Sequence, residues 1–150
     1  MEDFFTIFSP TNPVFRTYAF WSTVLMVKML FLGIGTGFQR KLAIFSKKEA
    51  VKSQTKAVSN VNEDIERMRR AHMNDMENIL IFLPLCFAYI LTNPFPWLAM
   101  TLIKAFAITR ILHTLVYAFA PVPQPTRFIL FLVGVFVNAY MGFSIVKAFF

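Results

Sequence analysis

The chain contains the segment Arg67-Met-Arg-Arg-Ala-His-Met-Asn-Asp-Met-Glu77, which runs without a glycine or proline into the apolar stretch Ile79–Thr92. As a helix the apolar stretch extends only about 21 Å, whereas the ~30 Å core of a bilayer requires about 20 residues. A helix that crosses a membrane here must carry its charged first turns into the membrane. Ionisable groups at that depth are costly unless they face other helices and find partners, so they are candidates for function.

The composition is that of an integral membrane protein. Hydrophobic residues make up 57% of the 150 residues, aromatic residues 17%, and the mean hydropathy is +0.57. The acidic start, Met1-Glu-Asp, lacks the basic region of a secretory signal, so we expect the first hydrophobic segment to be retained as an anchor. Cys86 is the only cysteine and lies in an apolar run, which excludes an internal disulfide framework and a zinc cluster of cysteines. The net charge of +7 is not arranged as a nucleic-acid-binding element and fits a membrane surface or small anions better.

Four segments are long and apolar enough to span a membrane. Prolines punctuate the two short connections at 93–96 and 120–125, where they remove backbone donors and favour turns. The one long linker, Gln39–Glu66, is rich in Lys, Ser and Gln, and we expect a cytosolic solvent loop of amphipathic or partly disordered character. The sequence thus predicts a single all-α domain over 1–150, an integral membrane four-helix bundle. Its expected spans are Val14–Phe38, Arg69–Thr92, Trp97–Phe119 and Phe128–Phe149.

Loop charge predicts the orientation of these spans. Nine Lys or Arg lie between Arg40 and Arg70, whereas the connection at 93–96 carries no charge. The positive-inside rule therefore places the first and third loops in the cytosol and both termini on the opposite side. Pro84, within the second span, is compatible with a functional kink and equally with ordinary transmembrane architecture.

Polar side chains recur at helical spacing near the expected cytosolic end of three spans. Spacings of three, four and seven residues bring side chains onto one face of a helix. On that basis we expect basic side chains from three spans to lie at the same depth, near the cytosolic face of the membrane. The side chains are Arg70, Asn74 and Glu77 on one face of the second span, Arg69 and His72 on a neighbouring stripe, Arg110, His113 and Tyr117 on the third span, and Arg127 at the start of the fourth.

Acidic residues are absent from the C-terminal part of the chain. No Asp or Glu occurs after Glu77, although four Lys or Arg follow it. Arg110 and Arg127 could pair with Asp75 or Glu77, but Arg69 and Arg70 compete for those acids. The planar carboxylates of a ligand would pair with the arginines that remain without an acid. Glu77 in turn suits an ammonium group. The pattern indicates a small peptide-like zwitterion with excess negative charge.

Each of these residues also has a plain structural interpretation. The arginines can anchor helix ends at phospholipid headgroups, the two histidines can be hydrogen-bonded structural residues, and Tyr117 can belong to an interfacial aromatic belt. Lys28 lies near the middle of the first span, where it either reaches for the interface or faces the bundle. Their combination in one place favours a site over these separate interpretations.

The segment Glu66-Arg-Met-Arg-Arg-Ala-His-Met-Asn-Asp-Met-Glu-Asn-Ile79 is similar to the hallmark segment of the MAPEG family, the membrane-associated proteins of eicosanoid and glutathione metabolism. Three further motifs resemble the microsomal glutathione transferase 1 branch in order and spacing: Phe38-Gln-Arg40, Ala107-Ile-Thr-Arg-Ile-Leu-His-Thr-Leu-Val-Tyr117 and Pro123-Gln-Pro-Thr-Arg127. Together they cover nearly the whole chain. The N-terminal Asn12-Pro-Val-Phe15 resembles insect members.

The resemblance implies an enzyme, a homotrimer of four-helix subunits that holds glutathione as a co-substrate, without a metal, between neighbouring subunits near the cytosolic face. Hydrophobic electrophiles or lipid hydroperoxides would arrive from the bilayer of the endoplasmic reticulum or the outer mitochondrial membrane. Arg127 would lie nearest the thiol and act catalytically with Arg110 and Tyr117. The glutathione contacts carried over by motif are Arg40, Arg69, Arg70, His72, Asn74, Glu77, Arg110, Tyr117 and Arg127.

The chain departs from the microsomal glutathione transferase 1 branch at one place, and three rival functions compete with the transferase. Mammalian members of the branch carry a cysteine in the first cytosolic loop whose modification raises activity, but Gln39–Glu66 contains none. The prostaglandin E synthase branch has Ser directly after the arginine corresponding to Arg127, where this chain has Phe128, so a glutathione-dependent isomerase ranks second. A non-catalytic lipid-binding scaffold and a small exporter follow. The exporter ranks last, because the first, third and fourth spans offer no carboxylate for proton coupling.

Overall fold

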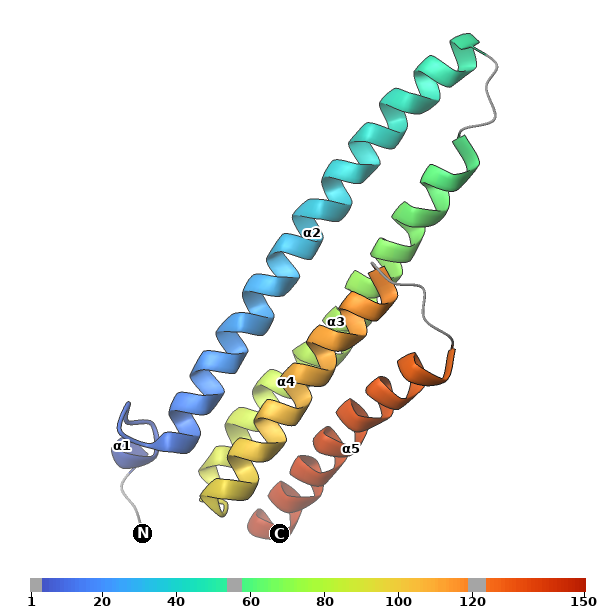
Figure 1. Ribbon diagram of the computed structural model, residues 1–150. Helices are drawn as coiled ribbons and strands as arrows, with labels where there is room; N and C mark the ends of the chain where they lie inside the picture. The colour runs from blue at the N-terminus through green and yellow to red at the C-terminus, as the bar shows by residue number, and fades with distance from the viewer. Residues whose placement is uncertain (1–3, 54–57, 119–123) are drawn as a thin grey trace.

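The structure is a computed structural model that describes residues 4–53, 58–118 and 124–150, and the side chains of 6–38, 41, 65–116 and 125–150 (Figure 1). A short helix α1 (Phe4–Ile7) precedes four long helices. The long helices are α2 (Pro13–Ser53), α3 (Val58–Leu91), α4 (Pro96–Ala118) and α5 (Gln124–Phe149). The described part of the chain contains no strand, and the predicted all-α class is confirmed.

Each long helix includes a stretch with the length and apolar composition to cross a membrane. These stretches are Pro13–Phe38, Ile65–Leu91, Pro96–Val116 and Pro125–Phe149. They agree with the expected spans to within a few residues. Large apolar side chains such as Phe136 and Phe143 point outward and are 68% and 70% exposed, as expected for a surface that meets lipid rather than water.

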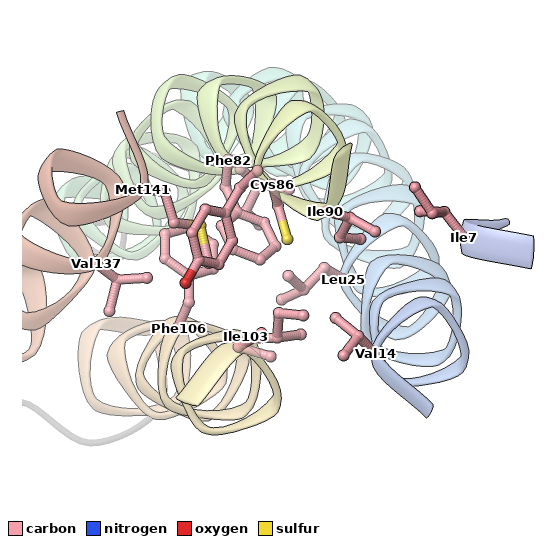
Figure 2. Packing of buried hydrophobic residues seen from close by; sticks show 14 residues of the cluster. Ile7, Val14, Leu25, Phe82, Cys86, Ile90, Ile103, Phe106, Val137 and Met141 are labelled. Atoms are coloured by element: carbon pink, nitrogen blue, oxygen red, sulfur yellow. The ribbon is translucent and has the colours of Figure 1, made fainter. Parts of the chain in front are cut away.

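The four helices form an antiparallel bundle (Figure 1). Helix α2 packs on α3 and α4, and α5 packs on the same two helices from the opposite side (Figures 1 and 2). The C-terminal part of α2 and the N-terminal part of α3 project well beyond the ends of α4 and α5. The basic segment 65–77 therefore enters the bundle from this projecting end.

Local sequence explains where the helices begin and turn. The Asn12 side chain caps α2, because its Oδ1 accepts a hydrogen bond from the Val14 amide at 2.9 Å, and Pro13 occupies the first helical position. After α3, Asn93 adopts a left-handed conformation with φ of 48°, which asparagine tolerates better than most residues. Pro96 then begins α4. The tight turn predicted at 93–96 is therefore present.

The linker expected over 39–66 differs from the structure. Helix α2 continues to Ser53 and α3 already begins at Val58, so most of the expected loop is helical. The physical reason is local, because residues 39–53 contain no glycine or proline and ten of the fifteen are Lys, Ala, Gln, Arg, Leu or Glu, which favour helices. The polar composition of this segment indicates exposure to water and does not distinguish a loop from a solvated helix.

The apolar core lies where all four helices face one another (Figure 2). Phe82 of α3 and Phe106 of α4 are fully buried and stack with ring centroids 3.9 Å apart. Cys86, one turn after Phe82, is fully buried and forms no disulfide, as its position in an apolar run predicted. This core separates the two ends of the bundle and supports the polar cluster beyond it.

Candidate functional site

A charged cluster lies inside the bundle, one helical turn from Phe106 toward the basic end. Lys28 of α2 donates from Nζ to Asp75 Oδ2 of α3 at 2.9 Å, and Thr114 Oγ1 of α4 lies 2.6 Å from the same carboxylate oxygen. Lys28 Nζ also donates to Thr114 Oγ1 at 2.9 Å and to the Arg110 carbonyl at 3.0 Å. Three successive membrane spans are thus tied together by one carboxylate.

Arg110 is the largest fully buried side chain of the described residues. Its Nη2 donates to Asn74 Oδ1 at 2.7 Å and lies 3.5 Å from Asp75 Oδ1. Its Nε and Nη1 are buried and have no hydrogen-bond partner among the described residues. Buried guanidinium donors without partners are costly, so this arrangement suits a ligand that brings acceptors.

Asn74 and Arg110, both predicted as glutathione contacts, are brought together directly. The pairing left open for Arg110 is also resolved, because the carboxylate beside it is Asp75 rather than Glu77. His113 of α4 is buried in the same region, close enough for the charges of Arg110, Asp75, Lys28 and Arg127 to act on its ring. Arg127, in the first turn of α5, therefore belongs to the same end of the bundle.

His72 occupies a different position from Asn74 and Arg110. Its ring packs against α2 at Gly33, where an added Cβ would lie 3.5 Å from His72 Cε1. The Nδ1 atom of His72 is buried and has no hydrogen-bond partner among the described residues. Within one subunit His72 thus contributes to the α2–α3 contact.

Three predicted contacts of α3 lie on the outer surface of the bundle. Arg69 Nε donates to Glu66 Oε2 at 3.0 Å, and both side chains are about half exposed. Arg70 and Glu77 are exposed on the same helix. One subunit therefore does not gather these side chains around Arg110. The structure does not describe the side chains of Arg40 and Tyr117. It gives only the positions of these two residues on α2 and α4.

Part of the cluster was not predicted from the sequence. Two orientations of Lys28 stayed open, Asp75 was only one possible partner of Arg110, and no role was predicted for Thr114. Two signals were available, since a lysine within an apolar span requires a buried acid or the interface, and Thr114 follows Arg110 by one helical turn. Neither signal alone fixes which helices meet.

An apolar groove of about 290 Å³ adjoins the cluster between α2 and α4. Lys28 and Thr114 form its polar part, and the rest is lined by Phe31, Leu32, Gly35, Met68, Ile111 and Leu115. Among the described residues no group of three or more His, Cys, Asp or Glu could hold a metal ion. The chemistry that these residues offer is the binding of an anion beside an apolar surface.

The sequence of the chain is similar to those of several known membrane enzymes and to one family model. The model of the MAPEG family matches residues 18–147. Microsomal glutathione S-transferase 1 of Sus scrofa is 34% identical over 143 residues, which cover 91% of this chain and 92% of the relative, and the Homo sapiens protein of the same name is 33% identical over the same share. Prostaglandin E synthase of Macaca fascicularis is 34% identical over 109 residues, 71% of this chain and 72% of the relative.

Proposed function

The chain belongs to the MAPEG family, and from this premise we propose that it is a membrane-bound glutathione transferase that also reduces lipid hydroperoxides. One structural observation carries the chemical part of this proposal. The fully buried Arg110 has no hydrogen-bond partner for Nε and Nη1 among the described residues, and it lies in a cluster of two cations and one carboxylate. Such a cluster attracts a ligand with carboxylates, and glutathione has two carboxylates and one ammonium group.

The binding roles follow from the charge of each side chain. The arginines, His72 and Asn74 bind the carboxylates and the peptide groups of glutathione, and Glu77 binds its ammonium group. The ion pair of Arg69 with Glu66 does not oppose this assignment, because both side chains are about half exposed and solvent screens their attraction. A ligand can therefore replace that pair at small cost.

Catalysis consists of ionising the thiol of glutathione. A free thiol with a pKa of ~8.5 is only a few per cent thiolate at neutral pH, and lowering that pKa by about 2 units requires about 2.7 kcal/mol. The Arg127 guanidinium supplies this energy to the sulfur anion, supported by Arg110 and Tyr117. The thiolate then forms a bond to an electrophilic carbon as the leaving group departs, or two glutathione molecules reduce a hydroperoxide to an alcohol and water and become a disulfide.

A homotrimer would complete the site. Arg70 and Glu77 are exposed on a membrane-spanning helix, where contact with lipid would be costly, and a neighbouring subunit would cover them. Arg40 on α2 and Arg127 on α5 belong to helices on opposite sides of the bundle (Figure 1). A pocket that uses both residues must therefore draw on two subunits.

Two further assignments follow from this proposal. Phe128, where the prostaglandin E synthase branch has Ser, is 60% exposed and offers no hydroxyl beside Arg127, so the transferase is favoured over the isomerase. As a multi-pass protein with microsomal relatives, the chain belongs in the endoplasmic reticulum membrane, with the outer mitochondrial membrane as a second location. Its basic projecting end faces the cytosol.

The test is a glutathione titration of the purified protein in detergent at neutral pH, followed by thiolate ultraviolet absorbance. We expect a saturable thiolate signal in the wild type that Arg127→Ala removes while glutathione still binds. Glu77→Ala should instead weaken binding and leave the signal at saturation intact. A wild type that binds glutathione without forming thiolate or turning over any electrophile would contradict the proposal and favour a lipid-binding scaffold.

A further inference from the structure

The hydrogen-bond donors of Lys28 are already used within the subunit. Its ammonium group has three N–H donors, and three acceptors lie within hydrogen-bond distance: Asp75 Oδ2, Thr114 Oγ1 and the Arg110 carbonyl, at 2.9, 2.9 and 3.0 Å. The Lys28 side chain is only 17% exposed. Whatever Lys28 does for function, it must do through these neighbours.

Asp75 is held on the side of Lys28. Its Oδ2 atom is the nearer oxygen for both Lys28 and Thr114, whereas Oδ1 lies 3.5 Å from Arg110 Nη2, beyond the usual hydrogen-bond range. Arginine and carboxylate prefer a bidentate pair with two short bonds. The contact of Asp75 with Arg110 is therefore looser than its contact with Lys28.

Arg110 keeps its charge available as a result. The cluster contains Lys28 and Arg110 as cations and Asp75 as the anion, so its formal charge is +1. Arg110 donates one hydrogen bond from Nη2 to Asn74, and its Nε and Nη1 have no hydrogen-bond partner among the described residues. Without Lys28 the same carboxylate would have only Arg110 to neutralise it, and the formal charge would be zero.

We infer that Lys28 is a positioning residue that occupies Asp75 and thereby leaves the Arg110 guanidinium available for a carboxylate of the bound thiol peptide. This inference rests on the proposed function and adds to it a residue that does not touch the ligand. Glutathione affinity should then follow the charge of the cluster. That charge is +1 in the wild type, 0 in Lys28→Met, +2 in Asp75→Asn and +1 again in the double variant.

The experiment measures the dissociation constant of glutathione by calorimetry in detergent. Lys28→Met, which keeps the length of the side chain, should weaken binding ~10- to 100-fold, the range for losing hydrogen bonds from a charged group. The double variant Lys28→Met/Asp75→Asn should recover most of that loss, because the neutral amide at position 75 no longer captures Arg110. Lys104→Met is the matched control, since Lys104 also lies within a span but is exposed on α4, and its affinity should be unchanged.

Recovery in the double variant is the decisive outcome. If Lys28 only tied α2 to α3 and α4, the second substitution would leave binding as weak or weaker, which would overturn the inference. Wild-type affinity in folded Lys28→Met would overturn it as well, while the proposed function would stand. If Lys28→Met fails to fold, as judged by gel filtration, Asp75→Asn alone must bind at least as tightly as the wild type. A wild type that does not bind glutathione would overturn the proposed function itself.

Discussion

Cys86 illustrates how burial decides the behaviour of a single reactive side chain. Its thiol is fully buried between helices in the apolar core, although the family resemblance raised the question of activation by thiol reagents. Cysteine reacts as the thiolate, which an apolar and inaccessible position disfavours. The only cysteine of the chain is therefore a packing residue.

We expect N-ethylmaleimide to leave both Cys86 and the glutathione transferase activity unchanged in the folded protein. Mass spectrometry after a timed incubation should show no adduct, while the same protein in sodium dodecyl sulfate should gain one label. The denatured sample is the control for reagent quality. Rapid labelling of the folded protein, or a rise in turnover after treatment, would contradict the burial of this thiol.

Single residues also show how far the site could be predicted. The spacing predicted Arg70, Asn74 and Glu77 on one face of the second span, but Asn74 contacts Arg110 inside the bundle, whereas Arg70 and Glu77 are exposed. The role of Lys28 and Asp75 could not be predicted, since it depends on which helices are neighbours and on distances between side chains far apart in the chain. Spacing along one helix carries no information about these contacts.

At the scale of the helix, hydrophobic length was a reliable guide and polar composition was not. The four spans were predicted to within a few residues because a bilayer imposes a minimum apolar length. The extension of α2 to Ser53 was missed, since the end of an apolar run marks the membrane boundary and not the end of the helix. Only a glycine, a proline or a cap would have marked that end.

Helix α5 approaches α4 closely at Gly134. An added Cβ there would lie 3.6 Å from Phe106 Cε2 and 3.8 Å from Arg110 Cδ, so alanine fits but a larger side chain does not. We expect Gly134→Leu to destabilise the protein by about 1–3 kcal/mol through overpacking and to displace the Arg110 side chain. Thermal unfolding in detergent and glutathione affinity should both decline.

Gly37→Leu provides the matched control, because a Cβ at Gly37 meets nothing within 4 Å. The same change in volume should leave both measurements near their wild-type values. Equal loss in the two variants would indicate a general effect of leucine at these positions and would argue against close packing at Gly134.

At the scale of the whole molecule, the proposed glutathione site would be incomplete in a single subunit. Arg110 and Asn74 face inward, Arg70 and Glu77 face outward, and α2 and α5 lie on opposite sides of the bundle (Figure 1). The sequence suggested that all these residues share one pocket. Spacing along a helix could not show which of them face the interior of the subunit and which face a neighbouring subunit. Association of copies is the simplest way to bring these faces together.

Co-expression of two inactive variants tests this division. Subunits with Arg40→Ala and subunits with Arg127→Ala should each form oligomers of low activity. Random mixing in a closed ring should restore roughly a quarter of the pockets. Each pocket needs an intact Arg40 from one subunit and an intact Arg127 from its neighbour, and each condition is met in about half of the cases. Pull-down through two different tags, followed by a transferase assay, measures the restored activity. Mixed oligomers without any recovery would show that one subunit supplies the entire pocket.

The charged cluster also has a consequence for how the protein is made. Lys28, Asp75 and Arg110 lie on three successive spans, so the ribosome delivers a cation, then the anion that neutralises it, then the second cation. An unpaired lysine near the centre of a span costs about 2.5–3.5 kcal/mol during insertion by the translocon. Arrival of α3 relieves this cost, and α4 then packs against a hairpin in which Lys28 is already paired with Asp75. A nascent chain that stalls after its first span would retain the unpaired charge, the kind of defect that membrane quality control can detect.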